Sequence, residues 1–328
     1  MIEAGGAAKI ALLMLIWSLL IVSPAIAATD NEQRAAAALF ARYETIFYTN
    51  ADLSSPLTPY KGLSRHAAGS LAIPFGELPA ALDLLNKHAS SEILGNADAV
   101  LIGARDFIPP RGAGSAGHPG LFCFIVVFGK QPTPSLAKFF TQTPATTGAA
   151  APTWKWVADL YEGEPAVSYY AAQVGLSYLV FSNDDKEIQE VARKLVSSDD
   201  PSRTLSTVRD WSFVGQHEYW GYRFIRRIGL VEKDLAGLDE FLPGVEAIAF
   251  CADINQKAGV MRLLGSQGTK RAVPNLNKRI ADETARSPMS FQPGTAGVWD
   301  APFSLSGGQV AMAKLWVIMS FFGYPIVI

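Results

Sequence analysis

Three pairs of apolar, β-rich runs limit what this chain can fold into more than any other feature of its sequence. The runs cover residues 97–107 and 121–129, 165–173 and 176–182, and 245–254 and 258–266. Neighbouring strands with short connections pair antiparallel, and the helices between such pairs collect on one face of the sheet. We therefore predict an α+β fold: a mostly antiparallel sheet built from strand–strand–helix units, with the helices packed on one face.

Helical patterns precede and separate these runs. Thr29 and Glu32 have the spacing of a capping box, and apolar residues then continue at helical spacing as far as Phe47. Further helices are predicted at 78–90, at 184–197 with Asn183 or Asp184 as its cap, from residue 200 onward, and within 275–287.

The chain divides by composition into four parts. Residues 1–27 resemble a targeting segment, 28–143 form an N-terminal α+β region, and 154–328 form a C-terminal α+β region. Between the two regions, residues 144–153 (PATTGAAAPT) are typical of a linker or exposed loop. The sequence leaves open whether the two regions form one domain.

The targeting segment has the pattern of a secretory signal peptide. Lys9 precedes a largely apolar run from Ile10 to Val22, and the small residues around Ala27 suit signal peptidase. The run is shorter than the roughly 20 residues that span a bilayer. We expect cleavage after Ala27 or Ala28 and a periplasmic or extracellular protein; an uncleaved membrane anchor and a buried N-terminal helix are the alternatives.

Charge limits the partners of the mature chain. The full chain has 28 basic and 30 acidic residues, and the signal peptide carries one of each, so the net charge stays at −2. A near-neutral protein lacks the basic face that nucleic acid requires. No Asn-x-Ser/Thr glycosylation site occurs, which fits a bacterial protein. An envelope polysaccharide, a lipid or a protein remains as the partner.

Two further apolar features have two interpretations each. Cys123 and Cys251 lie in strand-like runs, where they are either two separate buried thiols, which we favour, or a disulfide formed after export. Residues 310–328 are apolar except for Lys314 and Ser320. We expect this segment to complete the core, and membrane association is the alternative.

The stretch GAGSAG at 112–117 matches the glycine pattern of dinucleotide-binding loops. That loop must open directly into a helix, whereas here Pro109 and Pro110 precede it and a β-branched, aromatic run follows it. We therefore expect a hairpin loop, and no nucleotide or other cofactor.

The usual catalytic motifs are missing or incomplete. His217 and Glu218 begin an H-E-x-x-H zinc motif, but Gly221 stands where the second histidine is needed, so no metal is expected. The acidic pairs at 184–185 and 199–200 suit helix starts. Glu162 and Glu164 flank a glycine in a predicted turn, where a catalytic carboxylate pair is a remote alternative.

The segment HEYWGYRFIRR at 217–227 is the best candidate for a ligand surface. Alternation along a strand places aromatic side chains on one face together with Arg226. Arginine beside aromatic rings suits a sugar, a lipid headgroup or an anionic partner, although a half-buried strand explains the same pattern. The candidate ligand-binding residues are Trp220, Tyr222, Arg223, Arg226 and Arg227.

The order of elements across 175–227 resembles uncharacterised exported bacterial proteins that carry domains of unknown function. The resemblance rests on LSYLVFSNDDKEIQEVARKL followed by SRTLSTVRDW and YWGYRFIRR. It implies an extracytoplasmic α+β protein and no activity.

These patterns favour an exported, non-enzymatic protein with a binding or envelope-structural role, because no acid, base, nucleophile or metal set is assembled in sequence. One alternative is a hydrolase of envelope material whose site comes from residues distant in sequence. The other is a membrane-tethered protein held by an apolar terminus.

Overall fold

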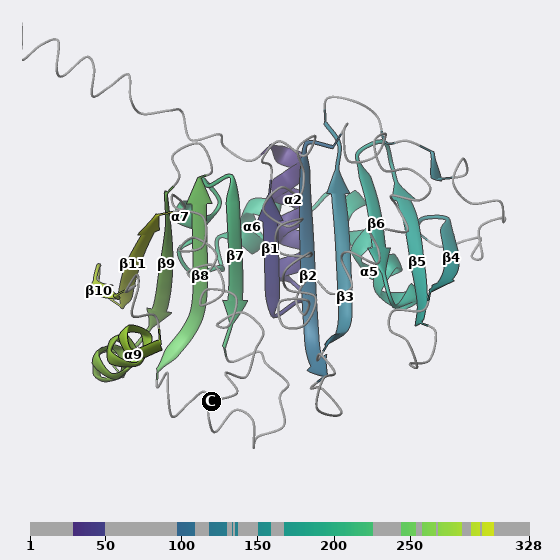
Figure 1. The fold of residues 1–328 in the computed structure, drawn as a ribbon. Coiled ribbons are helices and arrows are strands. Elements are labelled where there is room, and N and C mark those ends of the chain that lie inside the picture. The colour runs from purple at the N-terminus through teal and green to yellow at the C-terminus, as the bar shows by residue number, and fades with distance from the viewer. Residues whose placement is uncertain are drawn as a thin grey trace, which may run out of the picture.

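The computed structural model describes residues 29–49, 97–108, 118–129, 133, 135–136, 150–158, 167–225, 244–253, 258–266, 268–283, 290–295 and 297–304. Eleven strands in these ranges form one antiparallel sheet, in the order β10-β11-β9-β8-β7-β1-β2-β3-β6-β5-β4 (Figure 1). The strands are β1 (Thr45–Thr49), β2 (Ala99–Ile108), β3 (His118–Val127), β4 (Thr153–Ala158), β5 (Val167–Val174), β6 (Tyr178–Ser182), β7 (Tyr219–Phe224), β8 (Val245–Asp253), β9 (Ala258–Gly265), β10 (Gln292–Pro293) and β11 (Val298–Ser304).

Helices within the same ranges are α2 (Asp30–Phe40), α5 (Asp185–Val196), α6 (Pro201–Leu205), α7 (Trp211–Val214) and α9 (Thr269–Glu283). Helices α2, α5 and α6 pack together on one face of the sheet, while α9 lies at the end near β9 and β11 (Figure 1). The α+β class and the one-sided packing of these helices agree with the sequence prediction. None of the helices in the described ranges is long and apolar enough to cross a membrane.

Strand β1 corrects the prediction of a helix that reaches Phe47. Helix α2 ends at Phe40, and residues 45–49 pair with β2 on one side and β7 on the other. Both faces of β1 are buried: Ile46 lies in the core under the helices, and Phe47 contacts Phe250 on the opposite face. A strand buried on both faces has no polar alternation to show in its sequence, so helical spacing was matched by chance.

The helix starts follow the predicted capping chemistry. Glu32 and Thr29 form both hydrogen bonds of the capping box. Asp184 accepts a hydrogen bond from the Glu187 amide at the start of α5, and Asp200 accepts one from the Ser202 amide at the start of α6. Helix α9 begins earlier than predicted and contains Pro274, which has no amide hydrogen to donate within the helix.

Strands from both predicted regions belong to the same sheet. Strands β1, β2 and β3 of the N-terminal region lie in its middle, flanked on each side by strands of the C-terminal region. Thr153, the last residue of the predicted linker, begins β4. Several predicted features lie outside the described residues: the predicted signal peptide, the predicted helix at 78–90, the GAGSAG stretch, residues 144–149 of the predicted linker and the apolar segment at 310–328.

The two cysteines are buried, free thiols. Cys123 is on β3 and Cys251 on β8, which are separated in the sheet by β2, β1 and β7. Four strand spacings amount to about 19 Å, whereas a disulfide needs Cα atoms within about 7 Å. Burial raises the pKa of both thiols above the ordinary value, which keeps them protonated.

Candidate anion-binding pocket

The aromatic side chains proposed as a ligand surface on β7 belong to the core. Trp220 and Tyr222 are 1% and 0% exposed, and their rings lie 5.8 Å and 5.4 Å from the ring of Phe40 on α2. Arg223 is buried as well, because β7 is an interior strand between β1 and β8. These three side chains therefore do not offer the exposed surface that the sequence suggested. The other two candidates lie outside the described residues: Arg226 and Arg227.

Arg223 is unusual among the buried side chains of the sheet. Burial disfavours its charged form and lowers its pKa to about 10, against the opposing effect of the nearby Glu44 carboxylate. A guanidinium with this pKa is still charged at neutral pH. Arg223 and Glu44 thus place two opposite charges near each other among buried, largely apolar side chains.

His217, the histidine of the incomplete zinc motif, contacts the carboxylate of Asp253. His217 Nδ1 lies 3.0 Å from Asp253 Oδ2, and the Glu218 amide donates to the other oxygen of the same carboxylate. In the part of the chain that the structure describes, no three His, Cys, Asp or Glu side chains are grouped as a metal site. Glu162 and Glu164 lie outside that part.

A pocket of about 840 Å³ opens where β9, β11 and α9 meet. We call it the α9 pocket. It is lined by Arg209 from the turn between α6 and α7, by the end of β9, by the start of α9, and by the start of β11. Its lining residues are Arg209, Gly265, Ser266, Gly268, Lys270, Arg271, Gly297 and Trp299.

Arg209 ties the walls of the α9 pocket together. One terminal nitrogen donates to Glu246 Oε2 at 2.8 Å, and the other donates to the carbonyls of Gly265 at 3.1 Å and Gly297 at 3.2 Å. Its charge is therefore already paired with Glu246. Arg209 mainly fixes the position of the backbone at the ends of β9 and β11.

Glycine is required where the walls come close. Gly297 has a φ of +76°, and a Cβ there would lie 2.5 Å from both Arg209 Nη2 and the Gly265 carbonyl oxygen. A Cβ on Gly265 would lie 2.1 Å from Thr269 Oγ1. Any side chain at either position would push apart the contacts that shape the pocket.

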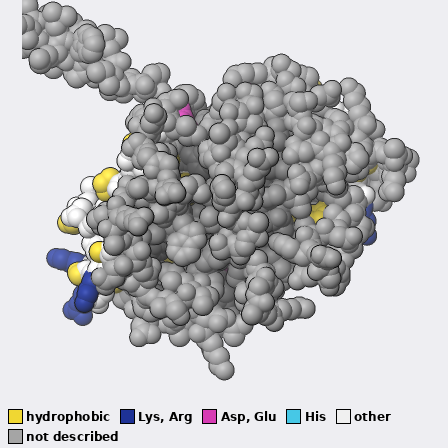
Figure 2. All heavy atoms as spheres, viewed as in Figure 1, with side chains coloured by type: hydrophobic (Ala, Val, Ile, Leu, Met, Phe, Trp, Pro, Cys, Tyr) yellow, Lys and Arg dark blue, Asp and Glu magenta, His cyan; other side chains and the backbone are white. Residues whose placement is uncertain are grey.

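The start of α9 supplies the uncompensated charge. Lys270 and Arg271 are exposed in its first turn, which contains no acidic residue. The amino end of a helix already carries a partial positive charge, so two cations there repel it. Within the described ranges, neither cation forms an ion pair. In Figure 2, dark blue Lys and Arg side chains project from the edge of the molecule where α9 lies.

Two anchors hold this end of α9 in place. Ala272, Val273 and Leu276 are buried, and the Asn277 amide side chain exchanges two hydrogen bonds with the backbone of Phe291. Thr269 is 0% exposed, and its hydroxyl oxygen, beside Gly265, has no hydrogen-bond partner among the described residues. The helix that carries the two cations is therefore packed against the rest of the protein.

A second ionic cluster supports the same walls from behind. Arg262 on β9 bonds both oxygens of Asp300, at 2.6 Å and 2.7 Å, and also pairs with Asp210. Asp210 directly follows Arg209, and Asp300 directly follows Trp299. These hydrogen bonds raise the pKa of Arg262, against the lowering effect of its burial. The cluster links the two chain segments that carry two of the pocket's lining residues.

Sequence reasoning missed this pocket because its residues come from three separate segments of the chain. One local signal was present: Lys270 and Arg271 stand next to each other a few residues before the predicted helix, with no acidic residue beside them. The predicted helix began after Pro274, which hid the position of these cations.

No family model matches the chain, and no curated protein matches it. Among solved structures, three crystal forms of TP0453 are similar in outline, each at 9% sequence identity. Form I has a TM-score of 0.39 and covers 88% of this chain and 97% of that chain; form III has 0.39, with 87% and 97%. Form IV has 0.36, with 85% and 95%.

Proposed function

We propose that this chain is an exported protein, periplasmic or extracellular, that binds an anionic ligand in the α9 pocket and performs no catalysis. The observation that carries the proposal is the pair Lys270 and Arg271, exposed and without ion-pair partners among the described residues, on the lining of a cavity at a helix amino end. Cations held in this way cost the free protein stability and attract an anion.

The rigid walls support binding over an accidental cluster of charge. Arg209 fixes two backbone carbonyls, and glycines allow the chain segments to approach closely. A preformed site avoids the ordering cost that a mobile loop would add on binding. The export part of the proposal rests on the pattern of residues 1–27.

Titration calorimetry with inorganic pyrophosphate tests the pocket. We expect micromolar to low-millimolar binding that weakens with added salt, and a loss of about 30-fold or more in the double variant K270E/R271E. Lys278→Glu is the matched control, because Lys278 is exposed on the same helix but does not line the pocket. Equal losses in both variants, or no binding at all, would refute the proposed site.

Cell fractionation with N-terminal sequencing tests export. A soluble species that starts at Ala28 or Thr29 supports the proposal. A membrane-bound species that retains residues 1–27 would instead support the tethered alternative, and a full-length cytoplasmic species would contradict both.

A further inference from the structure

We infer that the ligand of the α9 pocket is an acidic saccharide, a chain of linked sugar rings that carry carboxylate or phosphate groups. This inference rests on the proposed function and specifies its ligand. It follows from the size of the cavity, from what its walls lack, and from how its polar groups are distributed.

The cavity is too large for an isolated inorganic anion. Its volume of about 840 Å³ lies within the range of roughly 300–1,000 Å³ that is usual for sites of organic ligands. A water molecule takes about 30 Å³, so a single phosphate or sulfate would leave most of this space to solvent. The ligand that suits the cavity is therefore an organic molecule that carries a negative charge.

The lining excludes an acyl chain as the body of that molecule. Among the lining residues that the structure describes, none is Val, Leu, Ile, Met or Phe, and Trp299 is the one large apolar side chain. A lipid tail needs a continuous aliphatic wall to replace the water it loses. Phospholipid could therefore present at most its headgroup here.

The remaining lining suits hydroxyl groups and acidic groups. Glycines and Ser266 expose backbone and hydroxyl groups to the cavity, and Lys270 and Arg271 supply charge from one wall. A sugar combines hydroxyls with an apolar ring edge that an indole can contact, and its acidic groups pair with the cations. A polar, multiply hydroxylated anion uses every part of this lining.

Calorimetry with the purified protein, produced from the complete chain, tests the inference. The probes are trigalacturonate, the neutral trisaccharide maltotriose, inorganic pyrophosphate, AMP, and vesicles of phosphatidylglycerol in phosphatidylcholine. We expect trigalacturonate to bind about tenfold or more tightly than pyrophosphate and AMP, with no detectable binding of maltotriose or vesicles.

Two substitutions of Trp299 test how much its indole contributes to ligand binding. We expect Trp299→Leu to weaken trigalacturonate about fivefold and to change pyrophosphate binding less than twofold, while Trp299→Tyr keeps both near the wild-type values. Trp299 is 7% exposed, so folding of each variant is checked by near-UV circular dichroism. If Trp299→Leu does not fold, the rank order of the probes decides.

The outcomes separate the two proposals. If pyrophosphate, AMP or phosphatidylglycerol vesicles bind as tightly as trigalacturonate, the pocket still binds anions but the saccharide inference falls. If maltotriose binds as well as trigalacturonate, charge does not select the ligand and the inference falls too. If no probe binds, both proposals fall.

Discussion

Helices α5 and α9 begin in opposite ways, although each lies in one half of the same sheet. Helix α5 has Asp184 as its cap and Asp185 and Glu187 in its first turn, and Glu187 is paired with Arg42. Helix α9 has Lys270 and Arg271 in its first turn and no acidic residue there. The first arrangement satisfies the helix amino end internally, and the second leaves positive charge available to another molecule.

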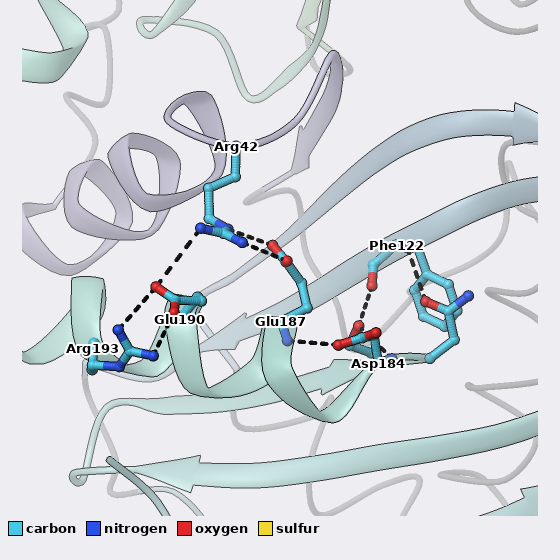
Figure 3. A network of polar contacts seen from close by, with 8 residues as sticks. Arg42, Phe122, Asp184, Glu187, Glu190 and Arg193 are labelled. Carbon is cyan, nitrogen blue, oxygen red and sulfur yellow. Dashed lines mark hydrogen bonds and ion pairs between the residues drawn. The ribbon is translucent and has the colours of Figure 1, made fainter. Parts of the chain in front are cut away.

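The start of α5 is closed by its own contacts. Arg42 donates to both oxygens of Glu187, at 2.5 Å and 2.6 Å, and Glu190 pairs with Arg193 nearby (Figure 3). Ser182 donates to the Phe122 carbonyl at 2.5 Å, which fixes the end of β6 before the helix begins. Every charged group that Figure 3 labels therefore has a partner within the protein.

The largest expected effect comes from removing the Arg42–Glu187 ion pair at the start of α5, which we call the closed end. Glu187→Gln should reduce the free energy of unfolding by about 3 kcal/mol at pH 7, because it removes one member of a largely buried, bidentate ion pair. Urea denaturation measures the loss. Glu190→Gln is the control, since its more exposed pairs with Arg193 and, at 3.8 Å, with Arg42 should contribute about 0.5 kcal/mol or less.

The same pair gives a pH dependence with a definite sign. Burial by itself would raise the pKa of Glu187, but the contacts with Arg42, together with smaller effects of Tyr43 and Arg105, outweigh burial and lower that pKa below 4.5. Its contribution is therefore complete above about pH 4.5 and is lost as the pH falls through the lower folded value. The difference between wild type and Glu187→Gln should shrink in acid, and a difference that stays constant would contradict this account.

A smaller effect on stability is expected at the α9 pocket and the start of α9, which we call the open end. Gly297→Ala should reduce the free energy of unfolding by about 2 kcal/mol, because φ is +76° and the new Cβ would meet Arg209 and the Gly265 carbonyl. Gly175→Ala is the matched control: its φ is +60°, but no atom lies within 4 Å of the added Cβ. That control should lose only about 1 kcal/mol.

Gly297→Ala should also weaken pyrophosphate binding, which Gly175→Ala leaves unchanged. Denaturation and calorimetry on the same two proteins make the comparison. Equal losses of stability at both glycines would show that the walls of the α9 pocket yield easily and are not preformed.

The closed end of the molecule was largely predictable from sequence, and the open end was not. The periodicity and the cap of α5 are local signals, as are the strand pairs around it, so these elements follow from short-range rules. The central strand β1 was predicted as helix because burial on both faces removes the alternation that marks a strand.

The α9 pocket was not predicted from the sequence, for a different physical reason. Arg209, Gly265, Lys270 and Trp299 meet only because β9 pairs with β11 in a particular register and Arg209 reaches across to their carbonyls. No local pattern encodes that register. The sequence instead favoured the strand at 219–224 as the ligand surface. A buried strand and an exposed binding strand can carry the same arginine and aromatic residues, so the sequence does not distinguish them.

The smallest expected change in stability is the one that most sharpens the comparison between the two helices. If Lys270 and Arg271 are kept for a ligand, K270E/R271E should make the protein more stable while it weakens binding, because acidic residues suit a helix amino end. We expect a gain of about 0.5–1 kcal/mol in urea denaturation at low salt. Salt at 1 M should remove most of the gain, because exposed charges are then screened over about 3 Å.

Lys278→Glu controls for an acidic substitution on α9 outside its first turn, with half the change in net charge of the double variant. It places a carboxylate beyond the first turn of the same helix, where the positive end of the helix no longer favours it, so it should not stabilise the protein. A double variant that loses stability would mean that the two cations support the fold through their own contacts. The contrast with α5 would then disappear, because both helix starts would be satisfied from within the chain.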